Sequence, residues 1–335
     1  MQIEYQTLEL RLHHTFHIAH GASDTRRNVI LRIGDGLGEA APVAYHGESA
    51  EAVTETLAGW QAELAHLDDP SAISWILERC QGSRATRAAV DLALHDALGK
   101  RLGCPVYQLL GLSKLPLPPT SFTIAITAPD ELAARVREAA AYPILKIKLG
   151  TDRDLEIVRT IRDVAPNTTL RVDANAGWTV EQALRLIPQL AELGVELIEQ
   201  PLSVDDFEGF RALKRARLPI PIIADESVKT PADVVRLADA VDGVNIKLMK
   251  TGGIQGALAA IQTARSCGLK IMLGCMVETS LGATAAAQLG GLVDWLDLDG
   301  PLLIANDPFT GLHFDGAHIS LPDAPGLGVM PIASA

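Results

Sequence analysis

Five ionisable residues follow one another at nearly constant intervals, each at or near the end of a short apolar run. They are Lys148, Asp173, Glu199, Asp225 and Lys247, separated by 25, 26, 26 and 22 residues. A strand, a helix and their two loops together need about this many residues, so the interval predicts consecutive βα units. In a closed barrel of such units, the residues at the C-terminal ends of the strands meet at one mouth. The spacing therefore predicts a single charged ring and an enzyme active site.

The three carboxylates of this ring predict a metal site. Asp173, Glu199 and Asp225 come from adjacent predicted strands, so their side chains are expected to share a small space. Like charges raise one another's pKa and force protonation unless a cation compensates them. Carboxylate oxygens select a hard ion, and three monodentate ligands with positions left for water and substrate suit Mg²⁺ better than Ca²⁺. We therefore predict one Mg²⁺ per active site.

The two lysines predict proton transfer. Lys148 and Lys247 belong to the second and sixth predicted strands, so they approach the site from opposite sides of an eight-stranded barrel. Lys146 lies two residues before Lys148 on the same strand face, and it and the metal are expected to lower a lysine pKa toward neutrality. Such a base could remove the proton α to a carboxylate, which leaves an enediolate. The second lysine could then return a proton to the other face of the same carbon. Taken singly, each lysine has the alternative of a solvated side chain or a neutraliser of carboxylates.

Extending the interval in both directions locates a whole barrel. The first predicted strand lies in 118–126, the seventh in 269–275 and the eighth in 292–300. After Gly300 the sequence has several Gly and Pro residues and no helical periodicity, so the eighth helix is predicted to be missing. The result is an α/β fold, a modified (β/α)7β TIM-type barrel over residues 116–304.

The N-terminal region has a different pattern. Partial apolar and polar alternation predicts antiparallel strands, and apolar residues at helical spacing predict helices that follow them. These strands and helices are expected over residues 1–19, 28–42, 49–64 and 84–102. We interpret 1–115 as an α+β capping domain, to which the C-terminal segment 305–335 returns.

Composition limits the class of protein. A chain of 335 residues that is 48% hydrophobic can bury more than one core. No apolar run reaches the roughly 18 to 20 residues of a membrane span, and no signal-like segment begins the chain, so a cytoplasmic protein without a membrane partner is expected. The net charge of -12 argues against a nucleic-acid partner, and a homo-oligomer is the default expectation for such an enzyme. The cysteines lack CxxC spacing and are expected to be reduced structural thiols; they are Cys80, Cys104, Cys267 and Cys275.

The motifs around the ring resemble a known family. They read LKIK, VDAN, EQP, ADES and NIKLMKTGG, and the cap contributes YHGES and RAAVDLALHDALG. As a set, and over nearly the full chain, they are similar to the muconate lactonizing subgroup of the enolase superfamily, in which a lysine base and Mg²⁺ support an enediolate. The resemblance implies acid/base roles for Lys148 and Lys247, with Lys250 the less favoured alternative to Lys247.

An Asp-x-Asp pair narrows the expected reaction. Asp297 and Asp299 are two apart on the presumed eighth strand, so both are expected to project to one side. The pair resembles that of the dipeptide epimerases, in which it binds the substrate's α-ammonium group while the C-terminal carboxylate chelates Mg²⁺. The alternative is that one Asp caps the following Asp-Gly turn.

The resemblance implies a Mg²⁺-dependent epimerase that inverts the α-carbon of the C-terminal residue of a small-molecule dipeptide by two-base 1,1-proton transfer. The alternative on the same scaffold is an o-succinylbenzoate synthase or a muconate cycloisomerase, which needs no ammonium site. A catalytically silent barrel with a binding role is the alternative of another class.

Segment 20–28 matches the family's loop that contacts the substrate's C-terminal side chain. Members acting on Ala-Glu place an arginine there, whereas this chain has Ser23 with Asp24 beside it. Arg26 and Arg27 are expected to face solvent or enter the strand, so an apolar or cationic C-terminal residue is predicted to be preferred over glutamate. The predicted substrate contacts are Lys146, Ser23, Asp24, Cys275, Met276, Asp297 and Asp299.

Overall fold

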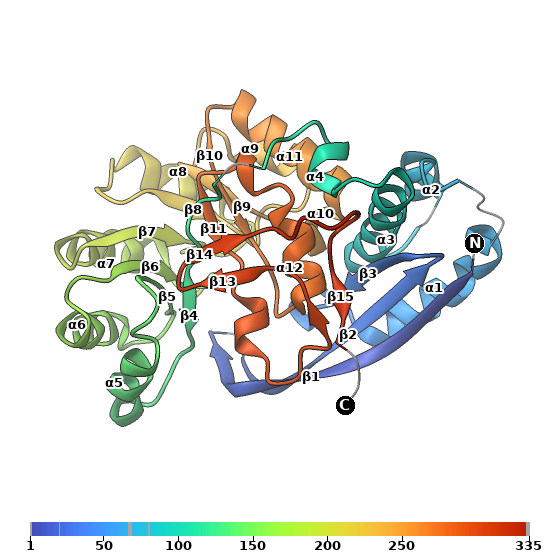
Figure 1. The fold of residues 1–335 in the computed structure, drawn as a ribbon. Helices are drawn as coiled ribbons and strands as arrows, with labels where there is room; N and C mark the ends of the chain where they lie inside the picture. Colours follow the sequence, from blue (N-terminus) through green and yellow to red (C-terminus); the bar gives the residue numbers. More distant parts are fainter. Residues whose placement is uncertain (1, 20, 66–68, 80, 115, 333–335) are drawn as a thin grey trace.

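The protein is described by a computed structural model that covers residues 2–332 apart from 20, 66–68, 80 and 115. A barrel of parallel strands with helices outside it forms the larger part, and an antiparallel sheet with its own helices lies beside the barrel (Figure 1). The predicted α/β barrel with an α+β cap is confirmed.

Eight parallel strands make the barrel, in the order of the sequence. They are β4 (Phe122–Ile124), β5 (Ile144–Lys148), β6 (Thr169–Asp173), β7 (Val195–Glu199), β8 (Ile222–Ala224), β9 (Gly243–Lys247), β10 (Lys270–Gly274) and β11 (Trp295–Asp297). A parallel bridge between Thr120 and Leu296 joins the two ends of the sheet. The predicted ring residues therefore belong to the second to sixth strands, as expected from their spacing.

Helices cover the outside of the barrel between consecutive strands. They are α5 (Pro129–Glu138), α6 (Asp154–Val164), α7 (Val180–Glu192), α8 (Phe207–Arg215), α9 (Pro231–Leu237), α10 (Leu248–Thr251), α11 (Ile254–Ser266) and α12 (Ser280–Ala287). In α7, Thr179 and Gln182 form a capping box, and Ala183, Ile187 and Leu190 are buried on one face at helical spacing. After β11 the only helix among the described residues is the 3-10 helix η3 (Gly300–Leu303), which confirms that the described chain has no eighth barrel helix.

The cap consists of a three-stranded antiparallel sheet and helices packed on it. Its elements are β1 (Ile3–Ile18), β2 (Gly21–Ile33), β3 (Gly36–Ala40), η1 (Ala44–His46), α1 (Ala50–Ala65), α2 (Ile73–Arg79), α3 (Arg84–Leu102) and α4 (Val106–Leu109). Helix α3 packs directly on β3. The approach is so close at Gly38 that a Cβ there would stand 1.9 Å from the backbone oxygen of Ala89. It ends at Gly103, whose φ of 68° is the left-handed conformation typical of a helix stop. Segment 20–28, expected as a loop, is mostly strand, because from Gly21 onward it pairs with β1.

The C-terminal segment runs back across both parts of the fold (Figure 1). Its elements are β12 (Phe309–Thr310), β13 (His313–Asp315), β14 (His318–Ser320) and β15 (Met330–Pro331), after η2 (Gly290–Leu292) in the barrel. Ile304 bridges to Leu12 of the cap, and the Leu327 N–H donates to Asp96 of α3 over 2.7 Å. This path agrees with the predicted return to the cap, and the domain limits at 115 and 304 stay an interpretation.

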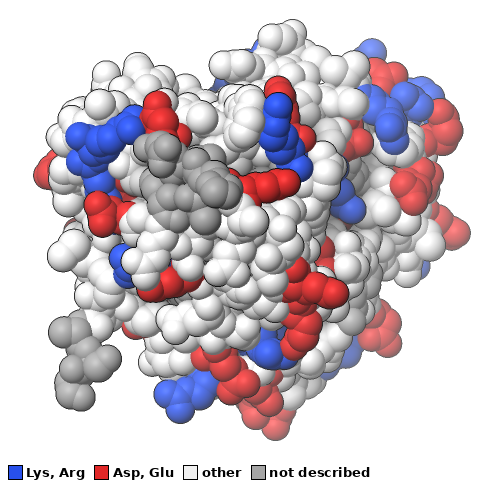
Figure 2. Space-filling model, turned by 90° about the vertical axis from the view of Figure 1, so that its right-hand side faces the viewer, with Lys and Arg blue, Asp and Glu red and all other residues white. Residues whose placement is uncertain are grey.

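Surface charges and cysteines are dispersed. On the cap-side face, basic side chains lie beside acidic ones rather than in one basic area (Figure 2). None of the described helices is both long and apolar enough to span a membrane. Cys104, Cys267 and Cys275 are unpaired thiols, whereas Cys80 lies outside the described residues.

Candidate active site

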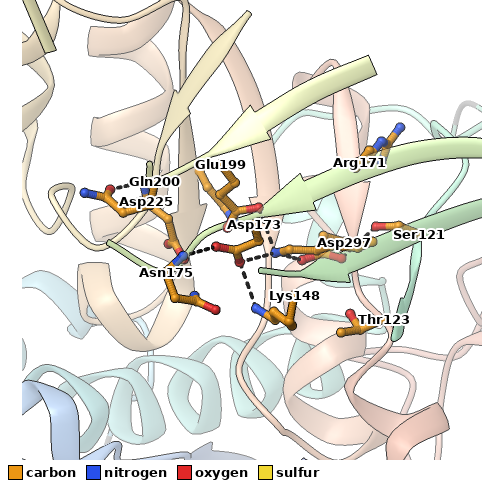
Figure 3. Close-up of polar contacts among 12 residues, drawn as sticks. Ser121, Thr123, Lys148, Arg171, Asp173, Asn175, Glu199, Gln200, Asp225 and Asp297 are labelled. Atoms are coloured by element: carbon orange, nitrogen blue, oxygen red, sulfur yellow. Dashed lines mark hydrogen bonds and ion pairs between the residues drawn. The ribbon is translucent and has the colours of Figure 1, made fainter. Parts of the chain in front are cut away.

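The three predicted carboxylates converge at the barrel mouth. Asp173 ends β6, Glu199 ends β7 and Asp225 follows β8, and their side chains are at most 2% exposed. One oxygen from each lies within 4.8 Å of the others, so the three can share one metal ion. Figure 3 shows Asp173 and Glu199 together, with Lys148 reaching toward Asp173.

The electrostatics of this triad favour a bound cation. Burial, and then the charge of Asp173, raise the pKa of Glu199 to about 8. Burial also acts to raise the pKa of Asp173, but Lys148 and Lys146 outweigh it and hold that pKa below its ordinary value. The lysines therefore do not offset the cost of ionising Glu199, and a bound cation would lower that cost. Because the donors are all carboxylate oxygens, a hard divalent ion such as Mg²⁺ fits the site.

Lys148 and Lys247 stand on opposite sides of the triad. Strands β6, β7 and β8 separate them in one direction around the barrel, and β10, β11 and β4 separate them in the other. Lys148 Nζ lies 2.7 Å from Asp173 Oδ2, and Lys247 Nζ lies 2.7 Å from Asp225 Oδ2. Burial lowers the pKa of Lys247, but the charge of Asp225 outweighs it and the pKa is raised. The protein's own charges thus oppose, at Lys247, the lowering expected from the sequence.

Two further lysines hold the carboxylates in place. Lys146 Nζ lies 2.7 Å from Glu199 Oε2, 2.7 Å from Asp297 Oδ2 and 3.1 Å from Asp173 Oδ2. Lys250 Nζ contacts Asp225 and donates to the backbone oxygen of Asn245 over 3.0 Å. Lys146 and Lys247 line the site cavity, and Lys250 is not among its lining residues. This difference favours Lys247 over Lys250 as the residue facing a substrate.

The ring opens into a cavity of about 120 Å³ between the barrel and the cap. Cys275 and Met276, which follow β10, line it as predicted. The ring of Phe16 lies 5.9 Å from Lys148 Nζ and covers that side of the cavity. The cap contributes the lining residues Phe16, Ile18, Arg26, Val43, Tyr45 and His46.

Asp297 and Asp299 both line the cavity, but strand alternation does not place them there. Asp297 ends β11, whereas Asp299 lies beyond the strand, directly before η3, and its side chain makes no capping hydrogen bond to that helix. Asp297 Oδ1 accepts the Ser121 hydroxyl over 2.7 Å, and Asp299 Oδ2 accepts the Thr123 N–H over 2.6 Å. Burial and the charge of Asp297 raise the pKa of Asp299 to about 6. Both side chains face the same cavity, as the prediction had it, but the presumed strand is shorter than expected, because β11 ends at Asp297.

Ser23 and Asp24 do not line the cavity. The exposed Asp24 accepts the Thr15 hydroxyl over 2.6 Å, and the Ser23 hydroxyl donates to the Thr25 backbone oxygen. The structure thus gives no support for the predicted substrate contacts of these two residues. Strand β2 extends to Gly21 and holds their side chains in contacts within the hairpin.

Arg26 lines the cavity instead, although the sequence analysis did not place it there. Its guanidinium donates to the Thr25 backbone oxygen over 3.0 Å, and burial lowers its pKa. Arg27 lies on the other face of β2, where it pairs with Glu51 of α1. Arg27 is two residues from Val29 and so lies on the same strand face, which packs against the cap helices. This alternation was the signal that could have separated the two arginines.

The sequence analysis also missed Glu226 and His46 as parts of the cavity. Glu226 accepts the Asn175 side-chain amide over 3.0 Å, and its Oε2 has no hydrogen-bond partner among the described residues. Burial and the charge of Lys250 lower the pKa of His46 to about 4. Both residues lie inside motifs that were noted, Glu226 in ADES and His46 in YHGES, so these motifs were the available signal.

Comparison with known proteins identifies the family. Residues 2–111 match the mandelate racemase / muconate lactonizing enzyme N-terminal domain, and residues 129–334 match the enolase C-terminal domain-like family. The chain belongs to the mandelate racemase / muconate lactonizing enzyme family. It is 40% identical to an L-Ala-D/L-Glu epimerase of Bacteroides thetaiotaomicron, over 99% of this chain and 88% of that protein.

Solved structures of this family share the whole fold. A substrate-liganded complex of the L-Ala-D/L-Glu epimerase from Bacillus subtilis superimposes with a TM-score of 0.93 at 33% identity, over 100% of this chain and 99% of the other. A dipeptide epimerase from Enterococcus faecalis V583, in complex with Mg and L-Leu-L-Tyr, has a TM-score of 0.91 at 32% identity and 98% coverage of both chains. The cap and the barrel therefore both follow the arrangement of this family.

Proposed function

We propose that this protein is a Mg²⁺-dependent dipeptide epimerase, an isomerase that inverts the α-carbon of the C-terminal residue. The observation that supports it most directly is the placement of Lys148 and Lys247 on opposite sides of a buried carboxylate triad. The similarity over nearly the whole chain to dipeptide epimerases, and to one complexed with Mg and a dipeptide, supports the same reaction.

Asp173, Glu199 and Asp225 would hold the Mg²⁺. When bound, the ion supplies positive charge that stabilises the enediolate formed after the substrate's α-proton is removed. Lys146 fixes two of the three carboxylates through its contacts with Asp173 and Glu199. The triad is thereby oriented before a substrate enters.

The two lysines carry out a 1,1-proton transfer. One neutral amine, on Lys148 or Lys247, takes the α-proton from its side, so a C–H bond breaks and an N–H bond forms. The ammonium of the other lysine then gives a proton to the opposite face of the same carbon, which inverts the configuration. The lysines exchange roles when the other stereoisomer is the substrate, so the net proton count is unchanged in both directions.

The acidic pair favours an epimerase over the alternative reactions of the scaffold. Asp297 and Asp299 are 4% exposed and face the cavity, and we propose that they bind the α-ammonium group of the dipeptide. A synthase or cycloisomerase of the o-succinylbenzoate or muconate type acts on a substrate without an ammonium group and would leave Asp299 facing the cavity without a cationic partner. A silent barrel has no need of two opposed lysines.

Arg26 changes the predicted preference for the substrate's C-terminal side chain. Among the cap residues that line the cavity it is the one with a permanent charge, because the lowered pKa keeps His46 neutral near pH 7. None of the described carboxylates forms an ion pair with Arg26 in the protein. We therefore propose that it pairs with an acidic C-terminal side chain, Glu or Asp, which reverses the preference expected from Ser23 and Asp24.

We also propose that the protein acts in the cytoplasm on a small-molecule dipeptide, without a nucleic acid or a membrane as partner. The net charge of -12 and the interspersed charges of Figure 2 support this proposal. A homo-oligomer remains an expectation.

The test is solvent exchange with a mixed library of L,L-dipeptides in D₂O, followed by mass spectrometry and chiral chromatography. We expect one deuterium at the α-carbon of the C-terminal residue, together with the L,D product. Loss of water from a cyclic succinyl substrate, with neither exchange nor inversion of any dipeptide, would instead establish the synthase alternative.

A further inference from the structure

A second cavity, larger than the site cavity, lies beside it. Its volume is about 450 Å³, and it is bordered by residues of β1, the end of β4 and α5. Phe16, Thr123 and Leu303 line both cavities. The two cavities therefore share these three residues as a common border.

The meeting point is at the proposed ammonium site. The Thr123 N–H donates to Asp299 Oδ2 over 2.6 Å, and the same residue lines the second cavity. Strand β4 is next to β11 in the closed barrel, as the bridge between Thr120 and Leu296 shows. The second cavity thus begins directly beside the carboxylate that would hold the substrate's ammonium group.

In a dipeptide, the ammonium group and the N-terminal side chain are attached to the same α-carbon. A dipeptide whose ammonium group binds Asp299 therefore carries its N-terminal side chain on the carbon next to that group, on the side of the cavity bordered by Thr123. The C-terminal residue must lie on the other side, between Lys148 and Lys247, where its α-proton is transferred. This polarity leaves the second cavity for the N-terminal side chain.

The inner lining of this cavity is apolar. Phe122 and Tyr142 stack with ring centroids 4.3 Å apart and planes 6° from parallel, and Ile124 is 5% exposed beside them. The outer lining is polar and exposed, with His13 and His17 on β1. An apolar floor below a polar rim suits a large apolar side chain.

Three titratable groups of the rim, His14, Arg135 and Glu138, contact one another, whereas Glu131 lines the same cavity and takes part in no ion pair among the described residues. Arg135 NH1 lies 2.6 Å from His14 Nε2 and 3.1 Å from Glu138 Oε2. An acidic side chain in the cavity would have to compete with Glu138 for Arg135 and would lie near Glu131. An aromatic or aliphatic side chain would instead bury apolar area against Phe122 and Tyr142.

We propose that this cavity is the subsite for a large apolar or aromatic N-terminal residue of the substrate. The inference rests on the proposed dipeptide epimerase function and extends it. An N-terminal alanine would leave most of the 450 Å³ unfilled, so substrates with Leu or Phe at the first position are favoured over those with Ala.

The first experiment varies only the N-terminal residue. Epimerisation of Gly-L-Glu, L-Ala-L-Glu, L-Leu-L-Glu and L-Phe-L-Glu is compared as kcat/KM. We expect the Leu and Phe dipeptides to exceed L-Ala-L-Glu by roughly tenfold or more. If L-Ala-L-Glu is turned over at least as fast, the inference is wrong and the proposed function stands. If neither these four dipeptides nor a wider library shows exchange in D₂O, the proposed function fails and the inference fails with it.

The second experiment fills the cavity. Ala125→Phe changes a half-buried residue that lines this cavity and not the site cavity, and Ala134→Phe is the matched control on an exposed position of α5. We expect Ala125→Phe to lower kcat/KM for L-Phe-L-Glu by roughly tenfold while that for L-Ala-L-Glu stays within about twofold. The control should change neither substrate.

A third variant guards against a folding defect in Ala125→Phe. Tyr142→Ala removes one of the stacked rings without adding volume, and it should raise KM for L-Phe-L-Glu and leave KM for L-Ala-L-Glu unchanged. Circular dichroism confirms that each variant is folded. Equal losses for the two substrates in both folded variants would show that the cavity does not hold the N-terminal side chain.

Discussion

Lys146 Nζ lies 2.7 Å from Asp297 Oδ2, and this ion pair connects the proposed ammonium site to the proposed metal site. The same amine lies 2.7 Å from Glu199 Oε2. Asp297 therefore has a cationic partner inside the protein, which it shares with the metal site. Asp299 forms no ion pair among the described residues. It is therefore the carboxylate that a substrate ammonium group would neutralise.

Asp299→Asn should therefore weaken dipeptide binding more selectively than Asp297→Asn. We expect Asp299→Asn to raise KM by roughly tenfold or more, with a smaller effect on kcat, because a buried ion pair to the substrate is lost. Asp297→Asn should instead lower the melting temperature, since Lys146 loses a buried partner. Steady-state kinetics and thermal unfolding of both variants separate the two effects. A pure stability defect in Asp299→Asn, with KM unchanged, would remove it from the substrate site.

Lys148→Ala and Lys247→Ala should each abolish epimerisation, lowering kcat by about 10³-fold. Each variant is expected to retain exchange of the α-proton in only one stereoisomer of the substrate, the one that faces the remaining lysine. The measurement is deuterium incorporation into the L,L and L,D dipeptides separately. Lys270→Ala, at a surface lysine paired with Asp294, is the control. Near-normal inversion in either active-site variant contradicts the two-base assignment.

Removal of the metal should inactivate the protein reversibly. We expect EDTA to abolish exchange, because without the ion the triad has no compensating cation. Added Mg²⁺ should restore exchange. Asp173→Asn, Glu199→Gln and Asp225→Asn should each shift the Mg²⁺ titration to higher concentration, measured both by activity and by calorimetric binding of the ion. Asp239→Asn, at an exposed carboxylate, should leave the titration unchanged. Wild-type Mg²⁺ affinity in all three ligand variants is the outcome that excludes this triad.

Arg26→Met should reduce discrimination in favour of an acidic C-terminal residue. We expect kcat/KM for L-Leu-L-Glu to fall by roughly tenfold or more, and that for the isosteric L-Leu-L-Gln to change little, because only the carboxylate pairs with the guanidinium. Arg27→Met is the matched control, since Arg27 is adjacent but pairs with Glu51 on the other strand face. If both variants keep the wild-type ratio of the two substrates, Arg26 does not select the side chain.

Titration of Glu278 is expected to lower the free energy of unfolding as pH rises. It lies beside Glu39, since a Cβ on Gly282 would be 2.3 Å from Glu278 Oε2 and 3.0 Å from Glu39 Oε2. Burial, and then the charge of Glu39, raise the pKa of Glu278 to about 8 from an ordinary value of 4.5. Between these two values the folded state holds a proton that the unfolded state has lost, so stability decreases as pH rises from about 4.5 through about 8.

Glu278→Gln should therefore stabilise the protein more at pH 8.5 than at pH 6. The measurement is the denaturant midpoint of the wild type and the variant at both pH values. Glu208→Gln, at an exposed glutamate of α8, should show no such difference. An equal shift at the two pH values would mean that Glu278 does not titrate in this window.

The ring itself could be predicted from the sequence, for a local reason. A βα unit has a nearly fixed length, so residues that recur at its interval must occupy equivalent positions at the strand ends. The placement of Asp173 and Glu199, and of Lys146 on the strand face of Lys148, follows from this interval and from the two-residue period of a strand. The missing eighth helix follows in the same way from the lack of helical periodicity after Gly300.

The cap side of the site was decided only by the tertiary structure. Ser23, Asp24 and Arg26 all lie in β2, whose pairing with β1 shifts register between Arg11 and Phe16, and of these three Arg26 lines the cavity. A shift of one residue exchanges the two faces of a strand, and local sequence does not fix it when both faces carry polar residues.

The charge balance inside the barrel also depends on long-range packing. Lys146 and Asp297 are 151 residues apart, and their contact exists only because the first and last barrel strands meet. The sequence determined which charged side chains gather at the mouth, since that depends on local repeat length. Which of them pair inside the protein and which remain for a substrate depends on closure of the barrel and on docking of the cap, and these are properties of the whole chain.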